Sequence, residues 1–262
     1  MVNQVLFPAL VLGGIALVLG AILAVASVIF KVDTDERIGQ IEEALPGANC
    51  GGCGFAGCSA YAAAIVAGEA PLTKCAVGGE KAQAAIADIM GMAAEKVEPK
   101  RAFVQCGGDC DAAALKFDYN GISDCAAAMR VAGGPKGCEF GCLGYGTCVS
   151  VCKFDAISIK NGIAVVDPDK CVGCGTCVNI CPRHVIKLRT TDKKSDIKCK
   201  STDKGALVRK YCKSGCLACG ICAKNCPQGA ITVDGVAKFD HEKCVGCGTC
   251  VEKCPAKCIE LA

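Results

Sequence analysis

The chain has 262 residues, 26 of them cysteine, no tryptophan and a formal net charge of +3. Apart from cysteine and one apolar N-terminal stretch, its apolar residues are mostly Ala, Val and Ile, which are too small to stabilise most of the chain by burial alone. This composition excludes an ordinary globular enzyme and requires disulfide bonds or bound metal.

The first segment, residues 1–31, predicts a transmembrane anchor. No charge occurs in residues 1–30, and Val5–Phe30 supplies 26 mostly apolar positions, enough to cross a ~30 Å hydrocarbon layer. A cleavable signal peptide would carry basic residues before its apolar core. Because the first basic residues, Lys31 and Arg37, follow the stretch, we expect a single-pass protein of the cell membrane with its C-terminal region in the cytoplasm. Thiols stay reduced there, which favours metal binding over disulfide bonds.

Residues 32–98 predict a small helical domain, with helices near Ile38–Leu45, Ser59–Ala67 and Glu80–Met92. Its cysteines follow the spacing C-x2-C-x4-C-x16-C, interleaved with glycines. A plant-type 2Fe-2S site would place x4 before x2. The spacing therefore predicts one 4Fe-4S cluster on a local set of ligands: Cys50, Cys53, Cys58 and Cys75.

The middle segment, 99–137, contains Cys106, Cys110 and Cys125 and shows no clear periodicity. Beyond it, segments 138–190 and 212–262 are copies of one another, separated by a basic linker, 191–211. The four cysteines of the run that begins at Cys171 recur at one constant offset in the run that begins at Cys244. At almost the same offset, Cys148 and Cys152 recur as Cys222 and Cys226.

Each copy predicts a cysteine run, a β-hairpin, a second cysteine run and a short closing strand. The expected hairpins are Ala156–Ile159 with Ile163–Val166, and Ala230–Val233 with Val236–Phe239, around the turns Asn161-Gly162 and Asp234-Gly235. The predicted fold class is α+β: one N-terminal transmembrane helix, a small helical 4Fe-4S domain, and two tandem bacterial-ferredoxin-like double-cluster units.

The run C-x2-C-x2-C-x3-C-P begins at Cys171, at Cys216 and at Cys244. It is typical of paired 4Fe-4S clusters, in which three cysteines bind one cluster and the fourth binds its neighbour. Structural zinc sites instead use two close pairs separated by a dozen or more residues, which does not match this spacing.

A fourth run, Cys138-x3-Cys142-x5-Cys148-x3-Cys152, departs from the pattern and has Lys153 in place of proline. We interpret it as an expanded loop that keeps its ligands. Crossed pairing then predicts four ligand sets: Cys138, Cys142, Cys148 and Cys181; Cys171, Cys174, Cys177 and Cys152; Cys216, Cys219, Cys222 and Cys254; Cys244, Cys247, Cys250 and Cys226.

Five clusters use 20 of the 26 cysteines and leave six. Cys258 is expected to be a thiol without metal, because Val185 stands at its place in the other copy. Four of the other five cysteines could bind a sixth cluster, or these thiols could be buried or redox-inactive. The five are Cys106, Cys110, Cys125, Cys199 and Cys212.

Basic residues concentrate between Arg183 and Lys213, where 11 Lys or Arg face three Asp. This segment is either a docking strip for an acidic partner protein or a solvated linker that offsets cluster charge. Neither a dinucleotide-binding motif nor a P-loop occurs, so we expect no flavin or NAD on this chain and no nucleic acid partner. We also expect no catalytic residues, since bond-making belongs to partners.

The order of these elements resembles the RnfB family, the B subunits of the Rnf complex, which is the membrane-bound ion-translocating ferredoxin:NAD oxidoreductase. The resemblance implies that the chain accepts electrons from soluble reduced ferredoxin and relays them to partner subunits that reduce NAD and translocate Na⁺ or H⁺. Two ferredoxin units and the cysteine-bearing middle segment distinguish it from the shortest members. The alternatives are an iron–sulfur subunit of another membrane hydrogenase or dehydrogenase, and a thiolate metal store.

Overall fold

The computed structural model describes residues 13–25, 35–93, 98–192 and 194–261. Residues 13–25 form a helix with exposed side chains. Among the described residues, no helix has both the length and the apolar character needed to span a bilayer. The rest of the expected anchor, residues 1–12 and 26–31, lies outside the described ranges.

A helical unit follows, built from α2 (Glu36–Ala44), α3 (Cys58–Val66) and α4 (Gly79–Met90), each within two residues of its predicted bounds. Ile41, Tyr61, Ile65 and Ile86 form its core and are at most 1% exposed. The Tyr61 hydroxyl donates to the Pro71 carbonyl oxygen at 2.8 Å and accepts from the Lys74 amide at 3.1 Å. This side chain therefore fixes the loop that carries the last cysteine of the unit.

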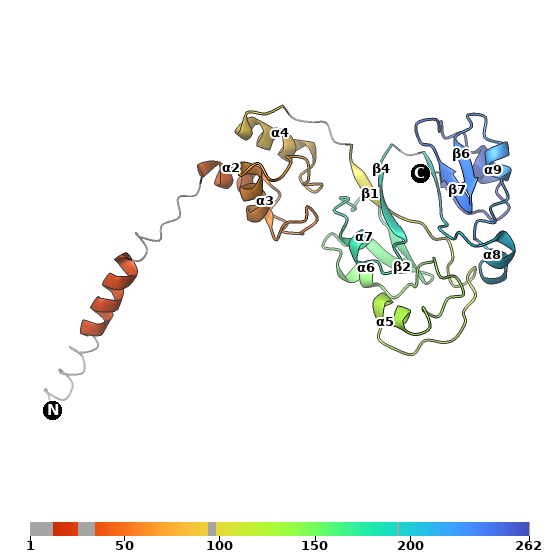
Figure 1. Ribbon diagram of the computed structural model, residues 1–262, viewed down its shortest axis with the longest axis horizontal. Coiled ribbons are helices and arrows are strands. Elements are labelled where there is room, and N and C mark those ends of the chain that lie inside the picture. The colour runs from red at the N-terminus through yellow and green to blue at the C-terminus, as the bar shows by residue number, and fades with distance from the viewer. Residues whose placement is uncertain (1–12, 26–34, 94–97, 193, 262) are drawn as a thin grey trace.

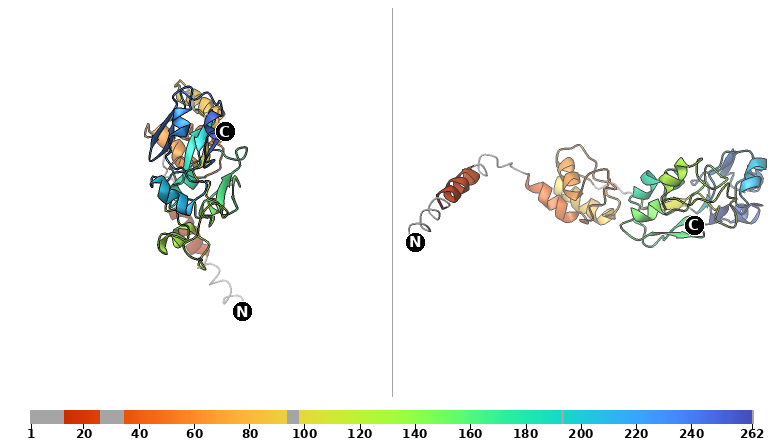
Figure 2. Two further views of the ribbon diagram at one scale, coloured as in Figure 1. Left: turned by 90° about the vertical axis from the view of Figure 1, so that its right-hand side faces the viewer. Right: turned by 90° about the horizontal axis from the view of Figure 1, so that it is seen from below.

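Two ferredoxin-like units come next, and the three units follow one another along the long axis of the molecule (Figures 1 and 2). The predicted hairpins are confirmed as two antiparallel pairs, β2 with β3 and β6 with β7. The first unit contains α6 (Thr147–Ser150), β2 (Ile157–Lys160), β3 (Ile163–Val166), α7 (Thr176–Ile180) and β4 (Ile186–Thr190). The second contains α9 (Ile221–Lys224), β6 (Ile231–Asp234), β7 (Val236–Phe239), α10 (Thr249–Glu252) and β8 (Ile259–Leu261).

The predicted closing strands are confirmed as β4 and β8, and each pairs with a strand from outside its own unit. β1 (Lys100–Val104) lies antiparallel to β4, and β5 (Ser195–Ile197) lies antiparallel to β8. The middle segment also contributes α5 (Cys125–Arg130), and the linker contributes α8 (Gly205–Tyr211). Both segments are therefore structural parts of the ferredoxin units.

Candidate metal centres

The same local geometry positions the third cysteine of every run in the two ferredoxin units. Each of these cysteines is the second residue of a short helix, α6, α7, α9 or α10. The residue before each helix is a glycine in the left-handed conformation, as at Gly175 (φ 81°) and Gly248 (φ 79°), which residues with a side chain rarely adopt. At all four places the turn directs a buried thiol into the unit. These thiols belong to Cys148, Cys177, Cys222 and Cys250.

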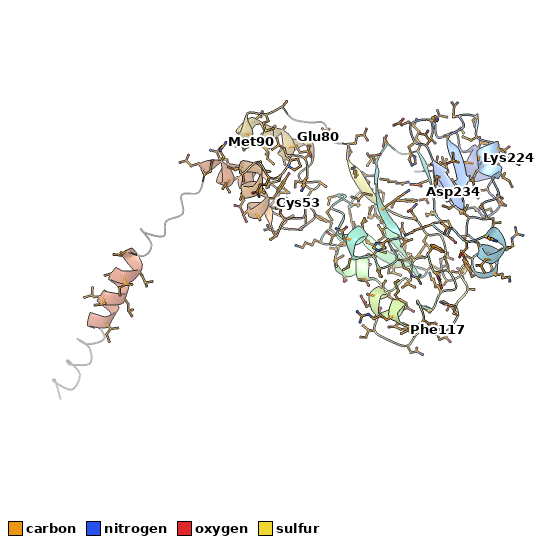
Figure 3. The ribbon with its side chains drawn as sticks, viewed as in Figure 1. Cys53, Glu80, Met90, Phe117, Lys224 and Asp234 are labelled. Atoms are coloured by element: carbon orange, nitrogen blue, oxygen red, sulfur yellow. The ribbon has the colours of Figure 1, made fainter. Side chains whose placement is uncertain are left out.

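The four predicted ligands of the helical unit line one cavity of about 390 Å³. Two hydrogen bonds shape its wall: Asn49 Oδ1 accepts from the Cys58 amide at 2.7 Å, and the Gly78 amide donates to Cys75 Sγ at 3.4 Å. Burial, followed by the neighbouring thiols of Cys53, Cys50 and Cys58, raises the pKa of Cys75. Figure 3 labels Cys53 within this unit.

In the first ferredoxin unit, the predicted set of Cys152, Cys171, Cys174 and Cys177 is gathered at one place. Burial raises the pKa of the Cys177 thiol to about 11, and the next contributions come from the other three thiols. The amide of Ala102, on β1, donates to Cys171 Sγ at 3.3 Å. The strand from the middle segment thus forms part of this site.

The second ferredoxin unit holds two cavities, of about 350 and 320 Å³. The larger is lined by the predicted set Cys216, Cys219, Cys222 and Cys254, and the smaller by the predicted set Cys226, Cys244, Cys247 and Cys250. Cys258 also lines the larger cavity, with its Sγ 3.6 Å from Cys254 Sγ. The structure therefore gathers both ligand sets, and cluster binding there stays a prediction.

The ligand set expected around the expanded run is divided between two places. Cys142 and Cys181 lie near Cys148: burial, then the thiols of Cys142, Cys125 and Cys181, raises the pKa of Cys148 to about 12. Cys138 instead lines a separate cavity of about 390 Å³. Adjacency along the chain groups Cys138 with Cys142 and Cys148, whereas the cavity that Cys138 lines contains none of the other three cysteines of this set.

The donors at all these sites fit iron–sulfur clusters. Thiol sulfurs are surrounded by backbone amides that donate to them, as the Ala164 amide does to Cys142 Sγ (3.5 Å) and the Ala230 amide to Cys226 Sγ (3.4 Å). Within the described part of the chain, no group of three or more His, Cys, Asp or Glu is arranged to hold a metal ion. A 4Fe-4S cluster differs in spreading its four thiolates around a cube of irons.

The basic segment between Arg183 and Lys213 has two parts. Lys187 and Lys198 form ion pairs with Asp196 (2.9 Å) and Glu260 (2.6 Å), and the guanidinium of Arg189 stacks on Phe103 at 4.3 Å. Four basic residues that are exposed to solvent flank α8 or lie on it: Lys204, Arg209, Lys210 and Lys213. Part of the segment neutralises internal charge, and the α8 part remains open to a partner.

Three family models match the chain. The FeS model, whose description names an Fe-S cluster, matches residues 45–77, and a 4Fe-4S binding domain matches residues 164–187. A 4Fe-4S dicluster domain matches residues 215–258. These matches cover the helical unit, the second cysteine run of the first ferredoxin unit, and nearly all of the second unit.

Curated relatives match over most of the chain. The B subunit of the Na(+)-translocating ferredoxin:NAD(+) oxidoreductase complex of Acetobacterium woodii is 48% identical over 93% of this chain and 74% of that protein. The B subunit of the proton-translocating ferredoxin:NAD(+) oxidoreductase complex of Clostridium ljungdahlii is 46% identical, covering 88% and 82%. The B subunit of the ion-translocating oxidoreductase complex of Methanosarcina acetivorans is 42% identical, covering 96% of both chains.

Proposed function

The chain belongs to the RnfB family, the B subunits of ion-translocating ferredoxin:NAD(+) oxidoreductase complexes, and we propose how it relays electrons. It is an electron-relay subunit, and the proposal concerns its ligands, its donor and its attachment to the membrane. Partner subunits reduce NAD and translocate Na⁺ or H⁺. The relatives favour this assembly over the hydrogenase alternative, since all three are named as subunits of such oxidoreductases.

The observation that supports the proposal best is the succession of cysteine-lined cavities, which lie in the helical unit, between the two ferredoxin units and in the second ferredoxin unit. The cavity of the helical unit includes Cys174 in its lining, and Lys153 Nζ donates to the Asn49 carbonyl oxygen at 2.7 Å across the same junction. At Gly52, any Cβ would collide with Cys174, so the two units approach as closely as backbone allows. Residues of the helical unit thus reach the first ferredoxin unit directly.

We propose that the four gathered ligand sets bind one 4Fe-4S cluster each: Cys50, Cys53, Cys58 and Cys75; Cys152, Cys171, Cys174 and Cys177; Cys216, Cys219, Cys222 and Cys254; Cys226, Cys244, Cys247 and Cys250. A bound cluster supplies one-electron redox chemistry. The thiolates hold it, backbone amides donate to its sulfurs, and the buried third cysteine of each ferredoxin run keeps water from one face.

We propose reduced ferredoxin as the donor and the exposed bases at α8 as its docking surface. Lys204, Arg209, Lys210 and Lys213 form a positive patch beside the Cys138 cavity, whose lining includes Tyr211 and Cys212. Positive charge attracts an acidic carrier over a Debye length of about 10 Å at 0.1 M salt. Replacing all four by glutamine should slow association about tenfold or more at low salt and by little at high salt. The same loss at every salt concentration would contradict docking there.

We further propose that residues 1–31 anchor the chain in the membrane. The support is the absence of charged residues from positions 1–30 and the helix at 13–25, on which Leu17, Leu19 and Leu23 are more than half exposed. Deleting residues 1–31 should move the chain from the membrane fraction to the soluble fraction when it is expressed without its partner subunits. A deleted chain that stays with the membrane would contradict the anchor.

The test of the cluster proposal is the iron and acid-labile sulfide content of the full chain purified without oxygen. Each bound cluster contributes about four of each. Reduced ferredoxin should then bleach the iron–sulfur absorbance of the chain, and the assembled complex should couple this to NAD reduction. Zinc in place of iron, or labile sulfide near zero, would overturn the proposal.

A further inference from the structure

One cavity is lined by cysteines from four separate segments. Cys106 follows β1, Cys138 begins the expanded run, Cys199 follows β5, and Cys212 follows α8. Three of them are at most 8% exposed. Their sulfurs lie around the same space: a Cβ on Gly108 would lie 3.3 Å from Cys212 Sγ and 3.6 Å from Cys106 Sγ, and one on Gly141 would lie 3.5 Å from Cys138 Sγ. The cavity of the helical unit is likewise lined by the four cysteines of its predicted set.

The internal duplication relates these cysteines in pairs. Cys138 and Cys212 are separated by the same offset that relates Cys148 to Cys222. Each also stands at the same spacing before the next cysteine of its unit, Cys142 or Cys216. The duplication therefore places one equivalent cysteine at the N-terminal end of each unit, Cys138 in the first and Cys212 in the second.

Cys106 and Cys199 form the second pair. Each lies two residues beyond the strand that pairs with the closing strand of its unit, β1 or β5. The Cys142 amide donates to Cys106 Sγ at 3.3 Å, and at the equivalent place of the second copy the Cys216 amide lies beside the Cys199 sulfur, where it opposes the rise in that thiol's pKa. Cys106 with Cys138 in the first unit and Cys199 with Cys212 in the second are therefore equivalent pairs. Both pairs line the one cavity between the two units.

A buried positive charge lies in the same wall. Lys136 is 4% exposed, lines the cavity, and its Nζ donates to the carbonyl oxygens of Gly108 (2.7 Å) and Gly162 (2.9 Å), neither of which carries a charge. A buried ammonium group is costly without a counter-charge. An oxidised 4Fe-4S cluster with four thiolates, at roughly −2, supplies one.

We propose that Cys106, Cys138, Cys199 and Cys212 bind a sixth 4Fe-4S cluster, which joins the two ferredoxin units. The inference deepens the proposed function and rests on it for the iron–sulfur chemistry. The site contacts Cys142 of the first unit through Cys106, and Cys216 of the second unit through Cys199. One electron enters from one neighbour and one leaves to the other, with no bond made or broken and no proton transferred.

The assignment requires a new fourth ligand for Cys142, Cys148 and Cys181, and Cys125 supplies it. Tyr145 occupies the position that the duplication makes equivalent to Cys219, so the first copy lacks the ligand that the second has there. The Cys125 amide donates to Thr147 Oγ1 at 2.7 Å, which places Cys125 beside the Cys148 turn. Six clusters then use 24 cysteines and leave Cys110 and Cys258.

The test compares the full chain with the double variant Cys106→Ser, Cys199→Ser. The wild-type chain should contain about 24 irons and 24 labile sulfides, and the double variant about 20 of each. Electron paramagnetic resonance of the fully reduced proteins should show about six and about five spins per chain. Matched controls are Cys110→Ser and Cys258→Val, which should retain the wild-type content because neither residue is a ligand.

The outcomes separate the two proposals. A wild-type content of about 20 irons, with no loss in the double variant, overturns the sixth cluster and leaves the electron relay intact. Absence of labile sulfide overturns both. If the double variant fails to fold, the wild-type iron count and spin count still decide between five and six clusters. A Cys138→Ser variant that removes the spin signal of the Cys148 site instead would overturn the assignment of Cys138.

Discussion

The two ferredoxin units share one plan but differ in where their proposed ligands come from. The second has an unbroken run with Pro227 after it, whereas the first has Tyr145 where the second has Cys219 and Lys153 where the second has Pro227. Both nevertheless form a hairpin of four residue pairs and a closing strand that pairs with a strand from outside the unit. The hairpin and turn positions therefore determine the fold, and a thiol can be supplied from a neighbouring segment.

The residues at which the first unit differs from the second make contacts with neighbouring segments. Lys153, in place of a proline, reaches the Asn49 carbonyl of the helical unit. The middle segment supplies Cys125 on α5 beside the Cys148 turn. The first unit thus joins its neighbours on two sides, while the second has the regular form of a double-cluster ferredoxin.

Removing the clusters should unfold both ferredoxin units. Five of the eleven buried residues in the first core and five of the nine in the second are cysteines, so little apolar contact remains without metal. After oxidation and chelation, amides of β2, β3, β6 and β7 should lose nearly all protection in hydrogen exchange. The α2–α4 helices, with an apolar core, are the internal control and should keep more protection. Persistent protection in both hairpins would contradict this expectation.

Cys125→Ser should remove the cluster of the expanded run and lower the iron content from about 24 to about 20 per chain. Tyr145→Cys restores the ligand position of the second copy, so the double variant Tyr145→Cys, Cys125→Ser should return to about 24. Iron analysis of the three proteins measures this. An iron content that is unchanged in Cys125→Ser alone would assign the fourth ligand elsewhere.

Thr147→Ile should weaken the support of Cys125 without removing a ligand. Thr147 Oγ1 accepts from the Cys125 amide and donates to Asp124 Oδ2, both at 2.7 Å, and the second copy has Ile221 at this place. Loss of these bonds should destabilise the unit by about 1 kcal/mol, measured as a lower midpoint of anaerobic thermal unfolding. Ser150→Ala, at an exposed hydroxyl of the same helix, is the control and should change the midpoint by less.

The pH dependence of the Thr147→Ile effect has a defined sign. Hydrogen bonds from the Ala127 amide and from Thr147 lower the pKa of Asp124 below its ordinary 3.8. The contribution of the carboxylate is therefore present above pH 3.8 and is lost as the pH falls through the lowered value. The difference between the two proteins should stay constant from pH 6 to 8, and a difference that varies across that range would point to another group.

Exchanging Cys258 and Val185 should produce the smallest effect. Cys258 is 3% exposed, and its sulfur lies 3.6 Å from that of the ligand Cys254, whereas Val185 offers no donor to Cys181. A donor to a ligand sulfur stabilises the reduced cluster, so Cys258→Val should shift one reduction potential of the second unit slightly downward at constant iron content. Val185→Cys should raise one potential of the first unit. Redox titration of both variants checks the opposite signs.

Features with local causes could be predicted from the sequence. The Asn161-Gly162 and Asp234-Gly235 turns predicted both hairpins, and cysteine spacing predicted the ligand sets that the structure gathers in the helical unit and in the second ferredoxin unit. These residues lie close in sequence or follow a known crossed pattern, so their proximity does not depend on the rest of the fold.

Features created by distant pairing could not be predicted in the same way. β1 and β5 are short strands whose partners, β4 and β8, lie far along the chain, so no local periodicity reveals them. Cys138 was grouped with Cys142 because they are adjacent in sequence, but the cavity that it lines exists only after β1 and β5 have docked. The equal spacing of Cys138 to Cys142 and of Cys212 to Cys216 is the signal that could have separated it.

The four segments that meet at the Cys106 cavity also impose an order on assembly. The proposed junction site draws its cysteines from Cys106 through to Cys212, whereas all proposed ligands of the helical unit lie between Cys50 and Cys75. During synthesis the helical unit can receive iron while the rest is still on the ribosome, but the junction site has to wait until Cys212 has emerged. A carrier that delivers clusters would therefore find the N-terminal site complete first and the junction between the two halves complete only after most of the chain has been made.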